Sequence, residues 1–239
     1  MRKWLCLVFT GILLLCCTSC DGKSDILSAT GEYNGKIITM SYKVTDVKYP
    51  WDMRSIEMQQ GYAVFYDYTW YEKYEETGVN PYLGDTWNLL DRDGNRIFDQ
   101  PYMNLTSFNK EGITVAQKMD GSYVQLNTKL EETTITEQEY TAFCLDRESN
   151  PCSKTYPKGE FNYSCINNDL AIYVELKEKD SYAGTAYAGL VDKDGNVIIP
   201  AFIPVSFYKM VERPHLSEDV AFVEDSATGN IGIITIARS

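Results

Sequence analysis

The segment Leu89-Leu-Asp-Arg-Asp-Gly-Asn-Arg-Ile97 returns later in the chain as Leu190-Val-Asp-Lys-Asp-Gly-Asn-Val-Ile198. A second, shorter pattern occurs four times, each time just before a run rich in apolar residues. Its small or acidic residue, which we call the marker position, falls at Gly61, Gly112, Asp169 and Asp219. Self-similarity at intervals of about 50 residues is typical of proteins that stack one supersecondary unit several times. The repeat therefore predicts the architecture before any single residue indicates an activity.

Each marker position opens a run that alternates between apolar and other side chains, as in Gly112–Gln117 and Val220–Val223. Alternation with a period of two, in runs rich in Val, Ile and aromatic residues, indicates β-strands. A second strand is expected in every copy, at 87–90, 123–126, 189–191 and 231–234. Copies one and three are expected to add a third strand, at 96–98 and 197–199. The chain is therefore predicted to be all-β.

Asp-Gly and Asn-Gly pairs stand between the predicted strands. Type I′ turns need positive φ at both central residues, which Asn, Asp and Gly tolerate. Two-residue hairpins of this type are predicted at Asn34-Gly35, Asp93-Gly94, Asp120-Gly121 and Asp194-Gly195, with a fifth at Gly229-Asn230. The best helical segment is Glu137–Asp146.

The four copies lie near residues 56–107, 108–160, 164–213 and 214–239. Copies one and three carry a long excursion between their first two strands, whereas copies two and four have a short turn there. Such units seldom bury their apolar faces alone and do so by stacking on their neighbours. We therefore expect four antiparallel hairpin or meander units in a stacked array. A small propeller-like ring is the alternative, because about 50 residues per copy also suits a propeller blade.

The third copy carries a family resemblance. Its segment Gly189-Leu-Val-Asp-Lys-Asp-Gly-Asn-Val-Ile-Ile-Pro200, with the marker pattern upstream, resembles the bacterial WG repeat. The name-giving Trp-Gly pair is divided among the copies, since Trp87 keeps the Trp while Gly189 and Gly232 keep the Gly. The resemblance covers residues 56–236 and implies an all-β repeat protein. That family has no shared catalytic residues to transfer to this chain.

Residues 1–19 have the features of a secretory signal: a basic start, a short apolar run, and small residues before Cys20. The end of this segment resembles a bacterial lipoprotein signal. The resemblance implies that Cys20 is lipidated and becomes the mature N-terminus. Residues 20–31 are then expected to form a tether, and residues 32–239 the repeat domain.

The chain is acidic, with 22 Lys and Arg residues against 34 Asp and Glu residues and a formal net charge of −12. Phosphates and anionic headgroups repel such a surface. Nucleic-acid binding, which needs clustered basic residues, is therefore not expected. The lipid on Cys20 would hold the protein to the membrane, and we expect it in the cell envelope on the extracytoplasmic side.

Three cysteines follow Cys20: Cys144, Cys152 and Cys165. A disulfide can persist outside the cytoplasm, and a Cys144–Cys152 bond would close a short loop. Three thiols leave one over. A zinc site is not expected, because the chain has no Cys-x-x-Cys spacing.

Aromatic residues gather at the start of the copy-one excursion, where Tyr66, Tyr68 and Trp70 would share one face of a strand. Flat aromatic side chains can stack on sugars or clamp a peptide. They also pack across strands and stabilise sheets. We favour packing and keep ligand binding by these three residues as a hypothesis.

The Asp-x-Asp-Gly-Asn segments that begin at Asp91 and Asp192 could suggest calcium. The EF-hand requires Gly at its sixth position and Glu at its twelfth, whereas turn geometry accounts for these residues directly. We expect no metal and no cofactor. No residue set with defined catalytic roles is recognised, so we do not expect an enzyme. The leading expectation is a non-catalytic, membrane-anchored protein that presents a surface to an unknown protein partner; a glycan- or cell-wall-binding module is the alternative.

Overall fold

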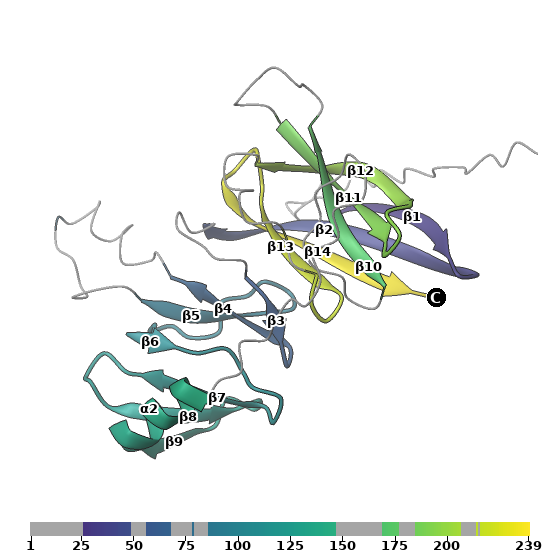
Figure 1. The fold of residues 1–239 in the computed structure, drawn as a ribbon. Coiled ribbons are helices and arrows are strands. Elements are labelled where there is room, and N and C mark those ends of the chain that lie inside the picture. Colours follow the sequence, from purple (N-terminus) through teal and green to yellow (C-terminus); the bar gives the residue numbers. More distant parts are fainter. Residues whose placement is uncertain are drawn as a thin grey trace, which may run out of the picture.

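The computed structural model describes residues 26–48, 56–67, 78, 86–146, 169–176, 185–206, 214 and 216–239. Over these residues the chain is built mainly of antiparallel strands, with one helix, α2 (Glu137–Asp146) (Figure 1). The all-β prediction is confirmed, and so is the position of the helix. Within the described part of the chain, α2 has neither the length nor the apolar character of a membrane span.

The described strands form four antiparallel sheets, which we name A to D. Sheet A holds, in order, β1 (Leu27–Tyr33), β2 (Lys36–Lys48), β14 (Asn230–Arg238) and β13 (Val220–Glu224). Sheet B holds β3 (Met58–Gln59), β4 (Tyr62–Tyr66) and β5 (Trp87–Asp91). Sheet C holds β6 (Asn104–Leu105), β7 (Ile113–Gln117), β8 (Tyr123–Asn127) and β9 (Glu132–Ile135). Sheet D holds β10 (Leu170–Leu176), β11 (Thr185–Asp192) and β12 (Val197–Ser206).

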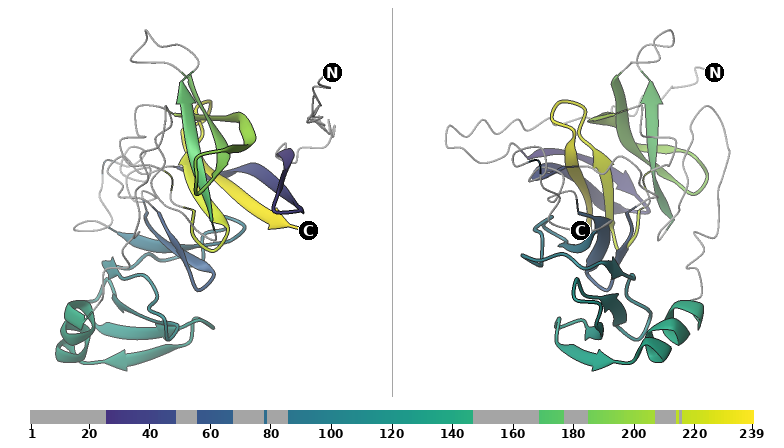
Figure 2. Two further views of the ribbon diagram at one scale, coloured as in Figure 1. Left: turned by 45° about the vertical axis from the view of Figure 1, so that its right-hand side comes forward. Right: turned by 90° about the vertical axis from the view of Figure 1, so that its left-hand side faces the viewer.

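Apolar clusters join the sheets in the order D, A, B, C. Ile234 of β14 belongs to the cluster that includes Leu190 of sheet D. Ile233, its neighbour in the chain, faces the other way and belongs to the cluster that includes Phe65 of sheet B. Leu89 of sheet B belongs to the cluster shared with sheet C. The sheets therefore form an open stack with C and D at its two ends (Figure 2), and the described residues do not close a ring.

Copy four is completed by the N-terminal hairpin. β14 pairs with β2 from Asn230↔Lys48 to Arg238↔Ile38. Ser239 and Ile37 then exchange two backbone hydrogen bonds of 3.0 Å. β2 thus occupies the third-strand position that β12 has in copy three. This pairing was not predicted, because residues 27–48 lie outside the repeat.

The predicted tether is too long. β1 begins at Leu27 and pairs with β2 along its whole length, from Leu27↔Tyr42 to Tyr33↔Lys36. Residues 27–31, which were assigned to the tether, are therefore part of sheet A. Ala29 in this segment is 5% exposed and belongs to the cluster between sheets A and D, so its burial and the pairing with β2 explain the difference.

The marker positions share one backbone property. Gly61, Gly112, Asp169 and Asp219 all have positive φ, at 82°, 74°, 66° and 61°. Each stands directly before a strand: β4, β7, β10 or β13. Gly has no Cβ penalty in this region, and Asp tolerates it better than most residues. The restriction to small or acidic residues therefore reflects turn geometry.

The type I′ prediction is confirmed at Asn34-Gly35, where both residues have positive φ (53° and 73°). It is wrong at Gly94, Gly121 and Gly195, since only the Gly of each pair has positive φ. In these turns the Gly N–H donates to the carbonyl three residues earlier, 3.0 Å in each case. The backbone therefore follows a type I turn with Gly in the left-handed fourth position.

Gly229-Asn230 does not form a two-residue turn either. Gly229 N–H donates to the Asp225 carbonyl (2.9 Å), which closes a longer loop. The Asp225 side chain accepts the N–H groups of Ala227 (3.2 Å) and Thr228 (2.8 Å) and so shapes this loop from within.

Third strands differ from the prediction in two copies. In copy one, residues 96–98 form only a bridge between Leu90 and Arg96. In copy two, β9 supplies a third strand that the sequence pattern did not indicate. Copy three has the predicted strand, extended in β12 to Ser206.

Candidate functional site

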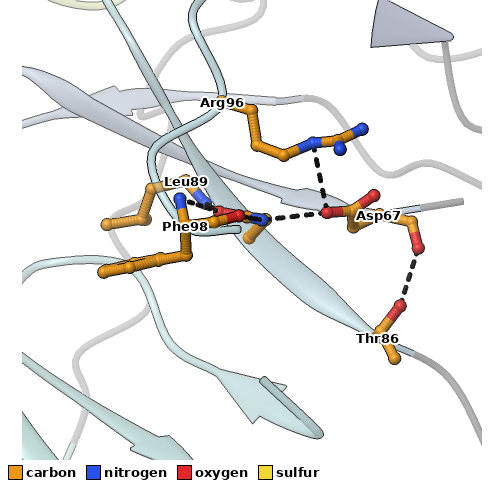
Figure 3. Close-up of polar contacts among 6 residues, drawn as sticks. Asp67, Thr86, Leu89, Arg96 and Phe98 are labelled. Atoms are coloured by element: carbon orange, nitrogen blue, oxygen red, sulfur yellow. Dashed lines mark hydrogen bonds and ion pairs between the residues drawn. The ribbon is translucent and has the colours of Figure 1, made fainter. Parts of the chain in front are cut away.

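The copy-one excursion leaves sheet B after Asp67 and returns at Thr86. Asp67 N–H donates to the Thr86 carbonyl (2.8 Å), and Thr86 Oγ1 donates to the Asp67 carbonyl (2.7 Å). Both side chains are buried, with Asp67 1% exposed. The two ends of the excursion are therefore fastened to each other where β4 ends and β5 begins (Figure 3).

The Asp67 carboxylate is the centre of a polar network. Asn88 Nδ2 donates to Asp67 Oδ2 (2.9 Å), and Arg96 Nε lies 3.4 Å from the same oxygen. The Arg96 side chain is one-third exposed, whereas Asn88 is fully buried. A buried carboxylate needs such partners, because an unpaired charge in the interior is costly. The network therefore fixes Asp67 and, through its backbone, the start of the excursion.

Asn88 also explains the missing third strand. Its Oδ1 accepts the N–H groups of Leu89 (2.8 Å) and Phe98 (3.1 Å), and its Nδ2 donates to the Phe98 carbonyl (2.7 Å). The side-chain amide of Asn88 thus makes the two hydrogen bonds to Phe98 that the backbone of a neighbouring strand would otherwise make. All its hydrogen-bonding groups are in use, and residues 96–98 are held away from a regular ladder.

The aromatic residues next to this network pack on one another. Tyr66 lies opposite Trp87 in the β4–β5 ladder, and their rings meet edge-on with centroids 5.5 Å apart. Phe98 and Tyr102 make a second edge-on pair at 5.1 Å. Such pairs contribute about 0.5–1.5 kcal/mol beyond burial of area. Tyr66 is therefore half-buried in a packing role, while Tyr68 and Trp70 lie outside the described residues.

A second polar group lies on sheet C. Tyr102 Oη donates to Glu132 Oε1 (2.5 Å), and Lys118 Nζ contacts Glu132 Oε2 (2.5 Å). Burial raises the pKa of Glu132, but hydrogen bonds from Lys118 and Tyr102 outweigh it, so that the pKa lies below its usual value. Burial, with the bond to Glu132, raises the pKa of Tyr102. Glu132 is thus a charged acceptor that ties β9 to the chain before β6.

Among the described residues of copy three, the position of Asn88 is taken by a different residue. The counterpart of Asn88 in copy three is Gly189, which pairs across the ladder with Tyr173. A Cβ on Gly189 would lie 2.5 Å from Tyr173 Cε1 and 2.7 Å from the Ile199 carbonyl oxygen. Tyr173 Oη instead accepts the Ala201 N–H (2.8 Å). In both copies a side chain hydrogen-bonds with the backbone of the segment that follows the Asp-Gly turn: Asn88 with Phe98 in copy one and Tyr173 with Ala201 in copy three. In copy one the same Asn88 also binds the carboxylate of Asp67.

The other predicted site residues are placed as follows. Cys144 is an exposed, free thiol on α2, and Cys152 lies outside the described residues, so the disulfide stays a prediction. Cys20 also lies outside them. Asp91 and Asp192 stand at the start of their turns, where each carboxylate accepts backbone N–H groups as the turn interpretation requires.

Sequence reasoning missed Asp67, Asn88 and Arg96. Two signals could have indicated them. Asp67 interrupts a run of aromatic residues at the end of a strand, and Asn88 replaces the Gly that stands at the same place in copy three. No family model and no curated protein matches this chain. The site is therefore interpreted from its own geometry.

Proposed function

We propose that this protein is a non-catalytic, membrane-anchored β-repeat protein of the bacterial cell envelope that presents the copy-one excursion to a protein partner. The observation that supports the proposal is the Asp67–Asn88–Arg96 network, which fastens both ends of the excursion and has no counterpart in copy three. A buried polar network of this kind specifies one local structure when all its members are satisfied. Stacked repeats also provide extended surfaces for binding.

The absence of an assigned reaction is part of the proposal. The Asp67 carboxylate is 1% exposed and bound by Asn88 and Arg96, which suits a structural acceptor better than a reacting group. Glu132 is likewise held by Tyr102 and Lys118. The resemblance to WG repeats, a family without shared catalytic residues, points the same way.

Photo-crosslinking in intact cells tests the partner. A photoreactive residue at Tyr68 or Trp70 should yield a discrete crosslinked species. The same residue at Val197, which is 44% exposed and stands in copy three where Arg96 stands in copy one, is the matched control. Equal crosslinking at the two sites would contradict a partner surface on the excursion.

A glycan- or cell-wall-binding module is the second candidate function. It rests on Tyr68 and Trp70, since Tyr66 already packs on Trp87. Replacement of Tyr68 and Trp70 by Ala should abolish polysaccharide pull-down if this function is right. Unchanged pull-down in the double variant, or none with the original protein, would end this alternative.

The anchor is tested separately at Cys20. Lipidation would place the acyl chains seven residues before Leu27, the first residue of β1. The Cys20→Ala protein should then leave the membrane fraction, because two or more acyl chains are what hold such a protein stably. A variant that stays in the membrane fraction would refute the anchor, whatever the result of crosslinking.

A further inference from the structure

The marker turn of copy one offers two backbone N–H groups on one side. Gln60 and Gly61, between β3 and β4, both have positive φ (55° and 82°). Consecutive N–H groups in turn conformations of this kind form a concave site for an anion. The site is filled by a carboxylate of the same chain: Glu218 Oε1 lies 2.5 Å from Gln60 N, and Glu218 Oε2 lies 2.9 Å from Gly61 N.

Glu218 reaches this turn from copy four. It stands in that copy's own marker turn and has a positive φ of 50°, a region that a Glu side chain disfavours. Arg92 Nη2 donates to the Glu218 carbonyl (2.8 Å), and Ser217 Oγ donates to the Met58 carbonyl (2.7 Å). Residues with a disfavoured backbone persist where the surrounding contacts determine them. The hydrogen bonds of Glu218 and Ser217 given above are made with residues of copy one.

We propose that the marker turn of copy one is a carboxylate-binding site and that Glu218 is its built-in ligand. The ligand class follows from the geometry, because each of the two N–H groups receives one oxygen of a single carboxylate. The site connects the turn before β13 of sheet A to the turn before β4, the strand that leads to Asp67. It therefore fixes the position of copy four relative to the start of the excursion. This inference does not depend on the proposed function.

The molecule contains its own control for the turn geometry. Asn34 and Gly35 also have two successive positive φ values (53° and 73°), yet no described side chain contacts their N–H groups. If any type I′ turn bound carboxylates, the two turns would respond alike. A built site predicts a response at Gln60 and Gly61 alone.

Glu218→Gly is the decisive variant. Gly suits the φ of 50° at this position, so a Glu without a ligand role would give a variant at least as stable as the original protein. We expect the opposite, a lower unfolding temperature. Sodium acetate should restore part of the loss in a saturable way that sodium chloride at equal ionic strength does not. Acetate should also shift the amide resonances of Gln60 and Gly61 in the full-length variant, and leave Asn34 and Gly35 unchanged.

Three results would overturn the proposal. The first is an unfolding temperature of Glu218→Gly equal to or above that of the original protein. The second is an identical effect of acetate and chloride. The third is an equal shift of both pairs of amides. Glu218→Gln, which keeps the size but loses the charge, should lie between the original protein and Glu218→Gly in unfolding temperature.

Discussion

Four turns among the described residues are organised by one kind of side chain, an Asp or Asn in the first position. Its Oδ1 accepts the backbone N–H groups of the residues two and four positions later. Asp91, Asn109, Asn127 and Asp192 all do this, with donor–acceptor distances between 2.8 and 3.1 Å. These bonds favour a type I turn over the type I′ turn that an Asp-Gly pair suggests. The Asp or Asn in the first position therefore supports the type I geometry of these four turns, and the turn from Lys118 to Gly121 adopts the same geometry without it.

Asp192 should be sensitive to loss of its oxygens. Its carboxylate accepts three bonds, from the N–H groups of Asp194 and Asn196 and from Asn196 Nδ2. Asp192→Ala should lower the free energy of unfolding by about 1–3 kcal/mol, because hydrogen bonds to a charged group are lost. Asp192→Asn should cost less, because Asn109 and Asn127 serve in the same position. Denaturant titration measures both; an Ala variant within about 0.5 kcal/mol of the original protein would contradict this account.

Glycine in the left-handed fourth position has two separable effects. Gly94 and Gly121 have similar φ values, 77° and 88°. A Cβ on Gly121 would meet open space, whereas one on Gly94 would meet the side chains of Ile233 and Thr45. Gly121→Ala should cost about 1–2 kcal/mol through the backbone alone, and Gly94→Ala should cost more. Equal losses in thermal unfolding would show that sheets A and B do not pack closely at Gly94.

Acid should weaken the contact between Tyr42 and Asp225. Tyr42 Oη donates to Asp225 Oδ1 (2.7 Å). Burial raises the pKa of Asp225, but hydrogen bonds from Thr228 and Tyr42 outweigh it and leave the pKa below the usual 3.8. A lowered folded pKa means that the stabilisation is present above the unfolded pKa and lost as pH falls through the folded one. Tyr42→Phe should cost about 1.5–3 kcal/mol at pH 7, and this difference in stability between the two proteins should narrow as the pH falls below the usual pKa of an Asp. A difference that stays constant as the pH falls would contradict the assignment.

At the scale of elements, the strands were predictable and their partners were not. The strands predicted for every copy appear where the alternation of apolar residues placed them. α2 begins directly after Thr136, which exchanges capping hydrogen bonds with Glu139. The pairing of β2 with β14 was not predicted, because residues 27–48 lie outside the four copies and almost 200 positions from β14. The site escaped prediction for a similar reason. Asp67, Asn88 and Arg96 come from three separate segments, and only the turn at Asp91 brings the last two together.

Asn88 and Gly189 make a matched pair for this interpretation. Asn88→Ala should remove the partners of Asp67 and of the Phe98 backbone, with a loss of about 2–4 kcal/mol if two buried groups are left unsatisfied. Gly189→Ala should also destabilise, but through the 2.7 and 2.8 Å approach of its Cβ to Ile199 O and Ala201 N. Hydrogen exchange distinguishes the two: Asn88→Ala should speed exchange near Phe98, and Gly189→Ala near Ala201. If hydrogen exchange became faster in the same segment in both variants, Asn88 and Gly189 would not have separate roles.

For the whole molecule, sheet A is the central layer because it has a neighbour on both faces. β14 supplies Ile234 and Ile236 to the cluster with sheet D, and Ile231 and Ile233 to the cluster with sheet B. This arrangement makes the N- and C-terminal hairpins one structural unit. It also shows that strands almost 200 positions apart in the sequence can complete one sheet while the stack of sheets stays open.

Deletion of residues 230–239 should therefore unfold more than copy four. β2 and β13 each lose β14 as a neighbour, and the clusters that join sheet A to sheets D and B both lose the apolar side chains of this strand. We expect amide protection to be lost in sheets A, B and D together. Native protection retained in both B and D would show that the stack is a row of independent units.

The central claim is that function lies where the copies differ, on the copy-one excursion. Replacing residues 68–85 by Asn-Gly would give copy one the short connection that copies two and four already have, with Asp67 and Thr86 still paired. The most direct measurement is crosslinking of this variant and of the original protein in intact cells, taken beside their unfolding temperatures. An amine-reactive crosslinker that acts through the lysines outside residues 68–85 captures the partner, and a photoreactive residue at Val197 in both proteins gives the background. The account predicts an unfolding temperature within a few degrees of the original, a shift of roughly 1 kcal/mol or less, and loss of the partner species. An unchanged partner species in the folded variant would contradict it.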